Sequence, residues 1–162
     1  MKSTFAIAFV VALGAIALAV AGIFYMQRGA QIALPGRILK IRTVPIDDTH
    51  SVAVADFRVH NTSDYPFMVR TVTLILEDAD GSQHPGLTSS EIDAQRFFDG
   101  TPALGPKYSK GWIARATVSG RAMEDHMVLA SFEFPEARLL ARKLFLVRIE
   151  EIDGKIFELS EK

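Results

Sequence analysis

The hydrophobic pattern divides the chain into one long apolar run and a region of short alternating segments. Residues 4–26 are twenty-three consecutive uncharged residues, with Lys2 before them and Arg28 after them. As a helix this run spans about 35 Å, enough to cross a hydrocarbon core of about 30 Å. Tyr25 falls at its downstream end, where an amphipathic aromatic side chain meets the headgroups. The pattern predicts a transmembrane anchor at 1–26, a tether at 27–35 and a folded domain at 36–162.

The same run also fits a secretory signal peptide. Lys2 gives a minimal positive n-region, Phe5–Leu18 gives an apolar h-region, and Ala19-Val20-Ala21 fits the pattern before a cleavage site. The apolar run nevertheless continues through Ile23-Phe24-Tyr25-Met26, so cleavage after Ala21 leaves a hydrophobic tip on the processed domain. We therefore expect a retained, uncleaved anchor, with signal cleavage as the alternative.

The basic residues around the run give conflicting signals about orientation. Arg28, Arg37, Lys40 and Arg42 follow it, and the positive-inside rule read alone places them in the cytoplasm. A long folded domain is translocated largely regardless of its charges, and a short n-region is typical of exported chains. We expect a single-pass membrane protein whose C-terminal domain is extracytoplasmic, on the periplasmic side of a bacterial membrane.

Small residues form a stripe along the predicted helix. At 100° per residue, five residues separated by steps of four and three fall within about 40° of one line. Such a stripe lets two helices approach closely in lipid, although an alanine-rich segment also produces one by chance. We expect this face to pack against another transmembrane helix of a larger complex. The stripe consists of Ala8, Ala12, Ala15, Ala19 and Gly22.

Alternating apolar and polar residues predict strands over most of the region after the tether. The segment 51–60 alternates, and its polar face, with Asp56, Arg58 and His60, is expected to meet water. The opposite, apolar face carries Ala53, Ala55, Phe57 and Val59. The strand is therefore predicted to be buried on one side only. Further strands are predicted at 37–44, 67–77, 126–134 and 144–151.

Short helices and turns separate these strands. Ser90-Glu91-Ile92-Asp93 has the form of a capping box, which predicts a helix at 91–99 with Gly100 at its C-cap. Residues 135–140 predict one more helical turn, and Asp153-Gly154 is the clearest hairpin signal. Six to eight short strands with one or two short helices predict a mainly β fold, an antiparallel β-sandwich.

Two segments carry a resemblance to a known class of domain. The run from Val54 to Ser63 resembles the "v-x-v-x-N-x-s" strand and turn of small immunoglobulin-like domains of membrane-anchored bacterial surface proteins. Gly120, followed by Leu129-Ala130-Ser131-Phe132-Glu133-Phe134-Pro135, resembles their "G…F-x-v-P" segment. The chain departs from them by lacking a lipobox cysteine and by its long segment between Asp80 and His126. The resemblance implies an immunoglobulin-like sandwich with a binding or assembly role and no catalytic residues.

Composition excludes several function classes. Removing Lys2 and Arg28 from the eighteen basic residues leaves sixteen against nineteen acidic residues, a net charge of −3 for the rest of the chain. A dedicated nucleic-acid binder is clearly basic, so we expect no nucleic-acid partner. The chain has no cysteine, which excludes disulfides, a thiolate nucleophile and Cys-based metal sites.

No pattern of polar residues predicts catalysis. The four histidines, His50, His60, His84 and His126, show no metal-ligand spacing. Asp56 and His60 share a strand face but lie about 13 Å apart at i and i+4, too far for an acid–base pair. The segment 78–82 only faintly resembles a calcium loop and predicts an ordinary turn. We expect a protein that is not an enzyme, with no cofactor and no metal.

One segment is basic and aromatic. From Gly100 to Met123 there is no acidic residue, and the only tryptophan lies within this stretch. On a membrane-tethered domain such a loop contacts anionic headgroups or docks on a partner protein. The alternative is that its aromatic residues cap the sandwich core while the lysines lie in water. The predicted contact residues are Lys107, Tyr108, Lys110, Trp112, Arg115 and Arg121.

Two functions follow from these expectations. The first is a non-catalytic, membrane-anchored β-sandwich that serves as an accessory, assembly or interaction subunit, with membrane lipid and other membrane protein subunits as partners. The second is an exported periplasmic or surface β-sandwich that binds a small ligand or a surface polymer after signal cleavage.

Overall fold

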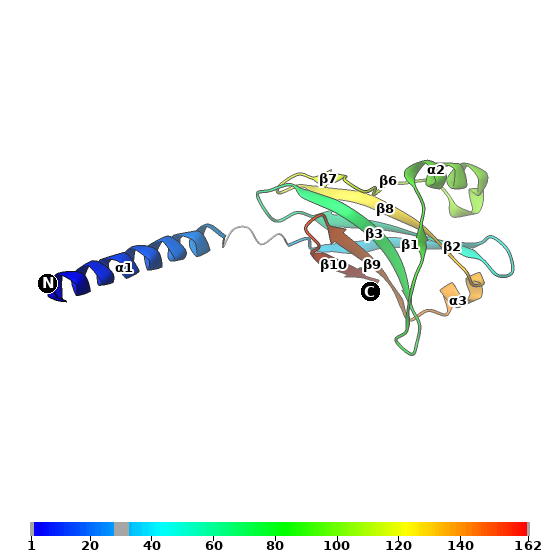
Figure 1. Ribbon diagram of the computed structural model, residues 1–162. Helices are drawn as coiled ribbons and strands as arrows, with labels where there is room; N and C mark the ends of the chain where they lie inside the picture. The colour runs from blue at the N-terminus through cyan, green and yellow to red at the C-terminus, as the bar shows by residue number, and fades with distance from the viewer. Residues whose placement is uncertain (1, 28–32, 162) are drawn as a thin grey trace.

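The computed structural model describes residues 2–27 and 33–161 of the 162-residue chain. Helix α1 covers Lys2–Gln27 and lies apart from a domain made of two β-sheets (Figure 1). Among the residues that the structure describes, no helix has both the length and the hydropathy of a membrane span. The anchor predicted at 1–26 is not supported by that finding and stays a prediction from the sequence.

The first sheet has the order β1-β2-β8-β5, and β6 pairs with β8 in parallel. β2 lies antiparallel between β1 and β8 over its whole length, from Ser51 opposite Phe132 to His60 opposite Met123. A bulge between Ile38 and Lys40 in β1 shifts the register, so Ile38 and Ile41 both pack toward the inner core. The bounds of these strands are β1 Gly36–Pro45, β2 Ser51–His60, β5 Leu87–Thr88, β6 Lys110–Gly111 and β8 Met123–Phe132.

The second sheet has the order β10-β9-β3-β4, with β7 paired to the beginning of β3. All of its pairings are antiparallel, and Gly154 adopts a positive φ of 86° in the β9–β10 hairpin, as its turn requires. The bounds are β3 Phe67–Glu77, β4 Gln83–Pro85, β7 Thr117–Val118, β9 Leu144–Glu151 and β10 Ile156–Ser160. Three helices complete the domain: α2 Glu91–Gly100, the 3₁₀ helix η1 Pro102–Leu104 and α3 Glu136–Leu140.

The core between the two sheets is aromatic and aliphatic. Phe57 of β2, Phe67 of β3 and Phe145 of β9 are fully buried there. Leu34, just ahead of β1, is also buried in this core and therefore fixes the point where the chain enters the domain. The mainly β fold predicted from the alternation of apolar residues is confirmed.

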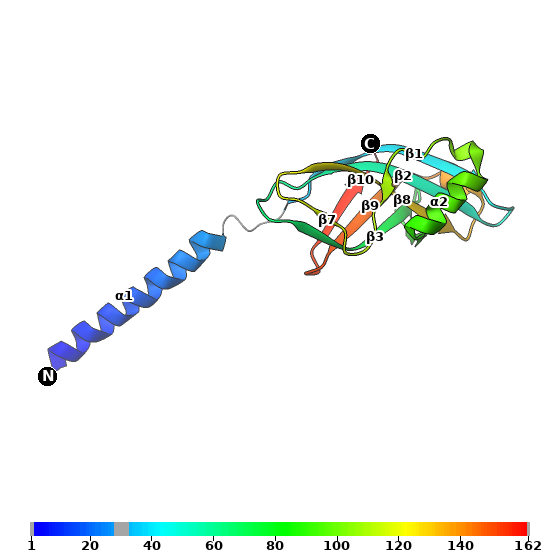
Figure 2. The ribbon, with the colours of Figure 1, turned by 90° about the horizontal axis from the view of Figure 1, so that it is seen from above.

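A second core lies on the outer face of the first sheet. Val54 of β2 and Leu129 of β8 pack there against Phe98 of α2 and Leu104 of η1. Figure 2 shows α2 lying over this face. This part of the sheet is therefore covered on both sides, and the expectation that Asp56 meets water is wrong, because Asp56 is only 3% exposed. Further along the same face Arg58 remains 39% exposed.

For the longer elements, the bounds predicted from local sequence signals lie within a few residues of the observed ones. Helix α2 begins after Ser90, whose side chain accepts a hydrogen bond from the Asp93 amide, as the capping box predicts. It continues through Gly100 and has Thr101 at its C-cap, one residue beyond the predicted end. The strand predicted at 126–134 begins earlier and ends earlier, at Met123–Phe132.

Candidate functional site

The predicted basic and aromatic contact residues are divided between the two ends of the domain. Lys107 forms an ion pair with Glu91 of α2, and the ring of Tyr108 lies 5.1 Å from the guanidinium of Arg42. Arg115 and Arg121 flank β7, which Figures 1 and 2 both place toward the end nearer α1. The structure does not gather the six residues into one surface, and their contact role stays a prediction.

Trp112 lies in the core and not on the surface. It is 5% exposed and its ring centroid lies 5.7 Å from that of Phe57 and 6.1 Å from that of Phe67. The imidazole of His126 stacks on it at 4.4 Å with an interplanar angle of 4°. Burial lowers the pKa of His126, and Glu124 opposes that shift. Trp112 therefore lies where the alternative interpretation puts it, in the sandwich core.

The polar centre of the domain is a buried ion pair between β1 and β2. A guanidinium nitrogen of Arg42 lies 2.7 Å from a carboxylate oxygen of Asp56, and both side chains are less than a tenth exposed. Another nitrogen of Arg42 donates to the backbone carbonyls of Leu104 and Pro106, each at 2.8 Å. Arg42 therefore attaches η1 and the loop after it to the first sheet. Burial raises the pKa of Asp56, and the charge of Arg42 opposes that rise.

Glu91 attaches the same segment at a second point. Its carboxylate accepts a hydrogen bond from Lys107 and another, at 2.6 Å, from the backbone amide of Gly111. A Cβ at Gly111 would lie 2.3 Å from a carboxylate oxygen of Glu91, so a larger residue there would displace this carboxylate. Together with Arg42, Glu91 holds the loop that carries Tyr108, whose side chain is 60% exposed.

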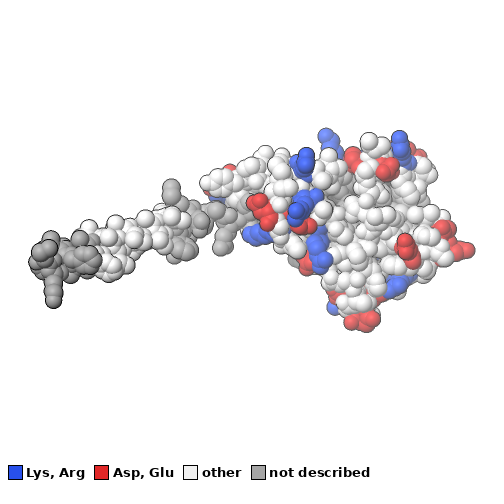
Figure 3. Space-filling view, viewed as in Figure 1, with Lys and Arg blue, Asp and Glu red and all other residues white. Residues whose placement is uncertain are grey.

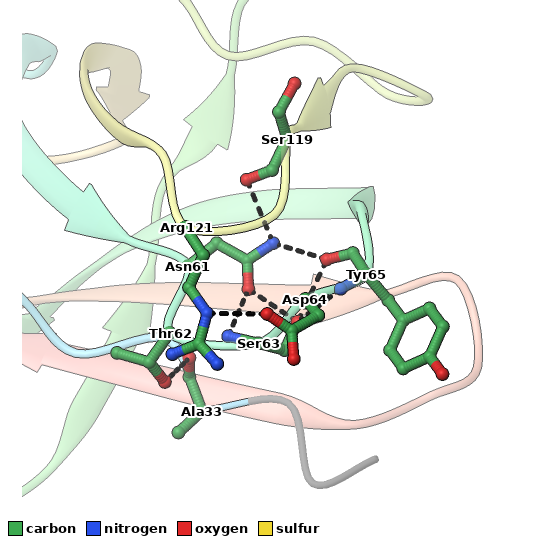
Figure 4. Close-up of polar contacts among 8 residues, drawn as sticks. All are labelled: Ala33, Asn61, Thr62, Ser63, Asp64, Tyr65, Ser119 and Arg121. Carbon is green, nitrogen blue, oxygen red and sulfur yellow. Dashed lines mark hydrogen bonds and ion pairs between the residues drawn. The ribbon is translucent and has the colours of Figure 1, made fainter. Parts of the chain in front are cut away.

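The other end of the domain is organised by Asn61 (Figure 4). Its side-chain amide donates to the backbone carbonyls of Tyr65, Val118 and Ser119, at 2.7, 3.1 and 3.2 Å. Its side-chain oxygen accepts from the amide and the hydroxyl of Ser63. One buried side chain thus joins the turn 61–65 to the loop after β7.

Thr62 joins the same turn to the segment that precedes β1. Both its backbone amide, at 3.3 Å, and its hydroxyl, at 3.1 Å, donate to the carbonyl of Ala33. Gly120 packs so closely on the turn that a Cβ there would lie 2.5 Å from the carbonyl oxygen of Asp64. The turn, the loop after β7 and the beginning of the domain therefore form one hydrogen-bonded unit.

We expect Asn61→Ala to destabilise the domain by about 2–3 kcal/mol, because buried carbonyls lose their donors. Urea unfolding measures the change, and Asn61→Asp tests its cause. The aspartate keeps the acceptor for Ser63 but loses the donor to the three carbonyls, so we expect it to be no better than alanine. An aspartate variant as stable as the original chain would contradict the role of these donor bonds.

A separate cleft lies between β4, β5, the end of β8 and α3. Its volume is about 560 Å³, and Phe132 and Phe134 contribute aromatic surface to it. Arg138 stacks over the ring of Phe134 at 4.5 Å and forms a 2.6 Å ion pair with Asp78. His84 also contacts Asp78, at 3.0 Å. Polar side chains, including His50, His84 and Arg138, line the cleft together with the apolar ones.

Other acidic side chains lie in a tight turn and in an exposed loop. In the part of the chain that the structure describes, no group of three or more His, Asp or Glu side chains is placed to hold a metal ion. The segment 78–82 forms a tight turn in which Gly81 donates to the carbonyl of Asp78. Asp47, which interacts with Thr49 and His50 in an exposed loop, has a lowered pKa because those groups hydrogen-bond its carboxylate.

The predicted small-residue stripe on α1 is exposed where it is described. This holds for Ala12, Ala15, Ala19 and Gly22, whereas the side chain of Ala8 lies outside the described residues. Apart from the neighbouring residues and backbone of α1 itself, no described atom lies within 4 Å of a Cβ placed on Gly22. The packing role of the stripe stays a prediction.

Comparison with known proteins gives a weak structural likeness only. No family model and no curated protein matches the chain. The chain is similar to the structure named "Putative ApaA Protein" from Bordetella pertussis, with 10% identity over 81% of this chain and 89% of that one and a TM-score of 0.35. It is also similar to a conserved hypothetical protein from Bacillus anthracis, with 10% identity over 82% and 99% of the two chains and a TM-score of 0.35. Likeness at this level supports no argument about fold family or function.

Proposed function

We propose that the protein is a non-catalytic interaction module, held at a membrane by α1 and acting as an accessory or assembly subunit of a membrane protein complex. In this proposal α1 is the transmembrane helix, and the two-sheet domain is the immunoglobulin-like sandwich that the sequence resembles. The domain lies on the extracytoplasmic side.

The observation that carries the proposal is how the apolar helix is joined to the domain. Only residues 28–32 separate the end of α1 at Gln27 from Ala33, which Thr62 holds by two hydrogen bonds. Leu34, the next residue, is buried in the core. A segment with no charged residue between Lys2 and Arg28 is thus attached to a hydrogen-bonded end of the domain by only a few residues. Such an attachment suits an anchor that also positions the domain.

A second candidate is an exported domain that binds a small ligand after cleavage at Ala21. The cleft of about 560 Å³ beside β4, β5 and α3 favours it, because that cleft offers aromatic walls and the cationic Arg138. This candidate needs neither α1 nor a membrane partner.

The intact mass of the natively produced protein separates the two candidates. We expect the full amino-terminal segment to be present, and the protein to sediment with membranes and co-purify with other membrane proteins in mild detergent. A mass that lacks residues 1–21, together with a monomer in the soluble fraction, would exclude the subunit proposal and favour the ligand-binding domain.

The small-residue stripe gives a matched pair of variants for the same test. Ala15→Leu places a bulky side chain within the stripe. Ala17→Leu makes the same change about 200° away, on the opposite face of the helix. We expect Ala15→Leu to lose the co-purifying membrane proteins and Ala17→Leu to keep them, because close helix packing depends on small residues. Equal recovery from both variants would contradict a packing role for the stripe.

A further inference from the structure

The end of the domain at which the chain enters carries exposed apolar side chains. Tyr65, Met68, Met123 and Ile152, here called the proximal rim, are 61, 37, 59 and 44% exposed. In the described structure this rim includes a tyrosine and two methionines whose side chains are not buried in the core. Single exposed apolar residues need no explanation, but four at one end of a domain form a surface.

Hydrogen bonds fix the four residues around the point where the chain enters. Tyr65 belongs to the turn that Thr62 ties to Ala33. Met123, the first residue of β8, pairs with His60 and follows Ala122, whose carbonyl accepts from the backbone amide of Asn61. The amide of Ile152 donates to the carbonyl of Met68, which brings the β9–β10 hairpin to the beginning of β3. The rim is therefore built from the turn 61–65, the first residues of β3 and β8 and the β9–β10 hairpin.

Chain length limits how far this end can lie from α1. Six peptide steps separate Gln27 from Ala33, and an extended chain of that length spans about 20 Å at most. The headgroup layer on each side of a bilayer is about 5–8 Å thick. If α1 spans the membrane, the entering end of the domain must stay close to the headgroups, whatever path the connection takes.

The two ends of the domain differ in charge. Figure 3 shows most of the visible Lys and Arg on the half nearer α1, with Asp and Glu among them, and mainly Asp and Glu on the opposite half. Arg37 and Arg121 are exposed near the rim, and Arg121 shares its charge with Asp64 at 2.8 Å. The opposite end carries the loop with Asp47 and the helix with Asp93. An anionic membrane surface repels the second end more strongly than the first, where arginines such as Arg58 and Arg70 balance the acidic side chains.

We propose that the proximal rim lies in the headgroup layer of the bilayer that holds α1, so that α2 and the Tyr108 loop face away from the membrane. Tyr and apolar side chains are favoured at this depth, because one part of the interface is apolar and the other is wet. This proposal rests on the proposed anchoring by α1. In this proposal the rim faces the lipid in place of Lys107 and Tyr108, because those two residues lie at the other end of the domain.

The absence of cysteine in the chain makes a clean test possible. Tyr65→Cys and Met123→Cys place a fluorescent label on the rim of the full chain, and Ile92→Cys places it on α2, where the apolar side chain is 65% exposed. Each variant is inserted into phosphatidylcholine vesicles that contain a lipid with a nitroxide on its headgroup. Circular dichroism confirms that the labelled chains are folded.

We expect the labels at Tyr65 and Met123 to be quenched several-fold more than the label at Ile92. Flotation of the vesicles separates the two possible failures. A chain that floats with the vesicles but shows equal quenching at all three positions overturns the rim proposal and leaves the anchoring intact. A chain that does not float overturns the anchoring, and the rim proposal with it.

Discussion

Replacing Asp56 by alanine is expected to destabilise the domain by about 3–5 kcal/mol, because the change leaves the charge of Arg42 buried without its partner. The two side chains form a 2.7 Å ion pair beneath α2 and η1, in a place that water does not reach. Arg42 also donates to the carbonyls of Leu104 and Pro106, so a displaced arginine loosens the segment that covers the sheet. Urea unfolding of the full chain measures the loss.

The double variant Arg42→Met with Asp56→Leu tests whether the loss comes from the unpaired charge. Well-packed apolar residues in place of a buried ion pair are often neutral or stabilising, since the desolvation of two charges is removed. We therefore expect the double variant to be much more stable than Asp56→Ala. If it is equally unstable, the hydrogen bonds of Arg42 to η1 matter more than the charge balance.

An exposed pair gives the control. Arg148 and Glu158 lie 2.7 Å apart across β9 and β10, and both side chains are about 40% exposed. Glu158→Ala removes an ion pair with the same N–O distance as the Arg42–Asp56 pair, but at a solvent-exposed position. Exposed ion pairs contribute about 0–1 kcal/mol to stability. A cost as large as that of Asp56→Ala would show that burial does not set the effect.

The raised pKa of Asp56 sets the direction in which its contribution to stability changes with pH. Because burial raises its pKa in the folded state, the folded protein binds this proton more tightly than the unfolded chain does. The contribution of Asp56 to stability is therefore complete below the unfolded pKa near 3.8 and decreases as the pH rises through the raised value. Carboxylates with lowered pKa, such as Asp64 and Asp125, act in the opposite direction as the pH falls.

The sequence predicted the elements whose signals are local. The alternation in 51–60 and 144–151 placed β2 and β9 within their observed bounds, and the capping box placed the beginning of α2. The strands β4, β5, β6 and β7 were not predicted, because segments of two or three residues carry no period. Their existence depends on neighbours that are distant in the sequence, such as β8 beside β6.

The candidate site was less predictable for the same physical reason. Alternation placed Asp56 opposite the core face but did not show that α2 and η1 return to cover that side. The sequence carried no local signal for the pair, because β1 also contains Arg37 and Lys40 and β2 also contains Arg58. The sequence also grouped Tyr108 with Trp112, whereas in the structure the first is exposed beside η1 and the second is buried between the sheets.

Trp112→Ala is expected to cost about 3–5 kcal/mol, the usual loss for a large aromatic side chain deleted from a core. Its ring packs on Phe57 and Phe67 between the sheets, so its removal leaves a cavity. Tyr108→Ala is the control, because its side chain is 60% exposed and its loss should cost less than about 1 kcal/mol. Urea unfolding of both variants measures the difference.

His126 gives the Trp112 variant a second readout. The imidazole stacks on the indole at 4.4 Å, and burial lowers its pKa. Removing the indole admits water to that ring, so we expect the pKa of His126 to rise toward its ordinary value in an NMR titration of Trp112→Ala. Tyr108→Ala should leave it unchanged. If Trp112→Ala changes neither the stability nor the pKa of His126, the core position is contradicted. If that folded variant also loses a binding partner, Trp112 belongs to an interaction surface.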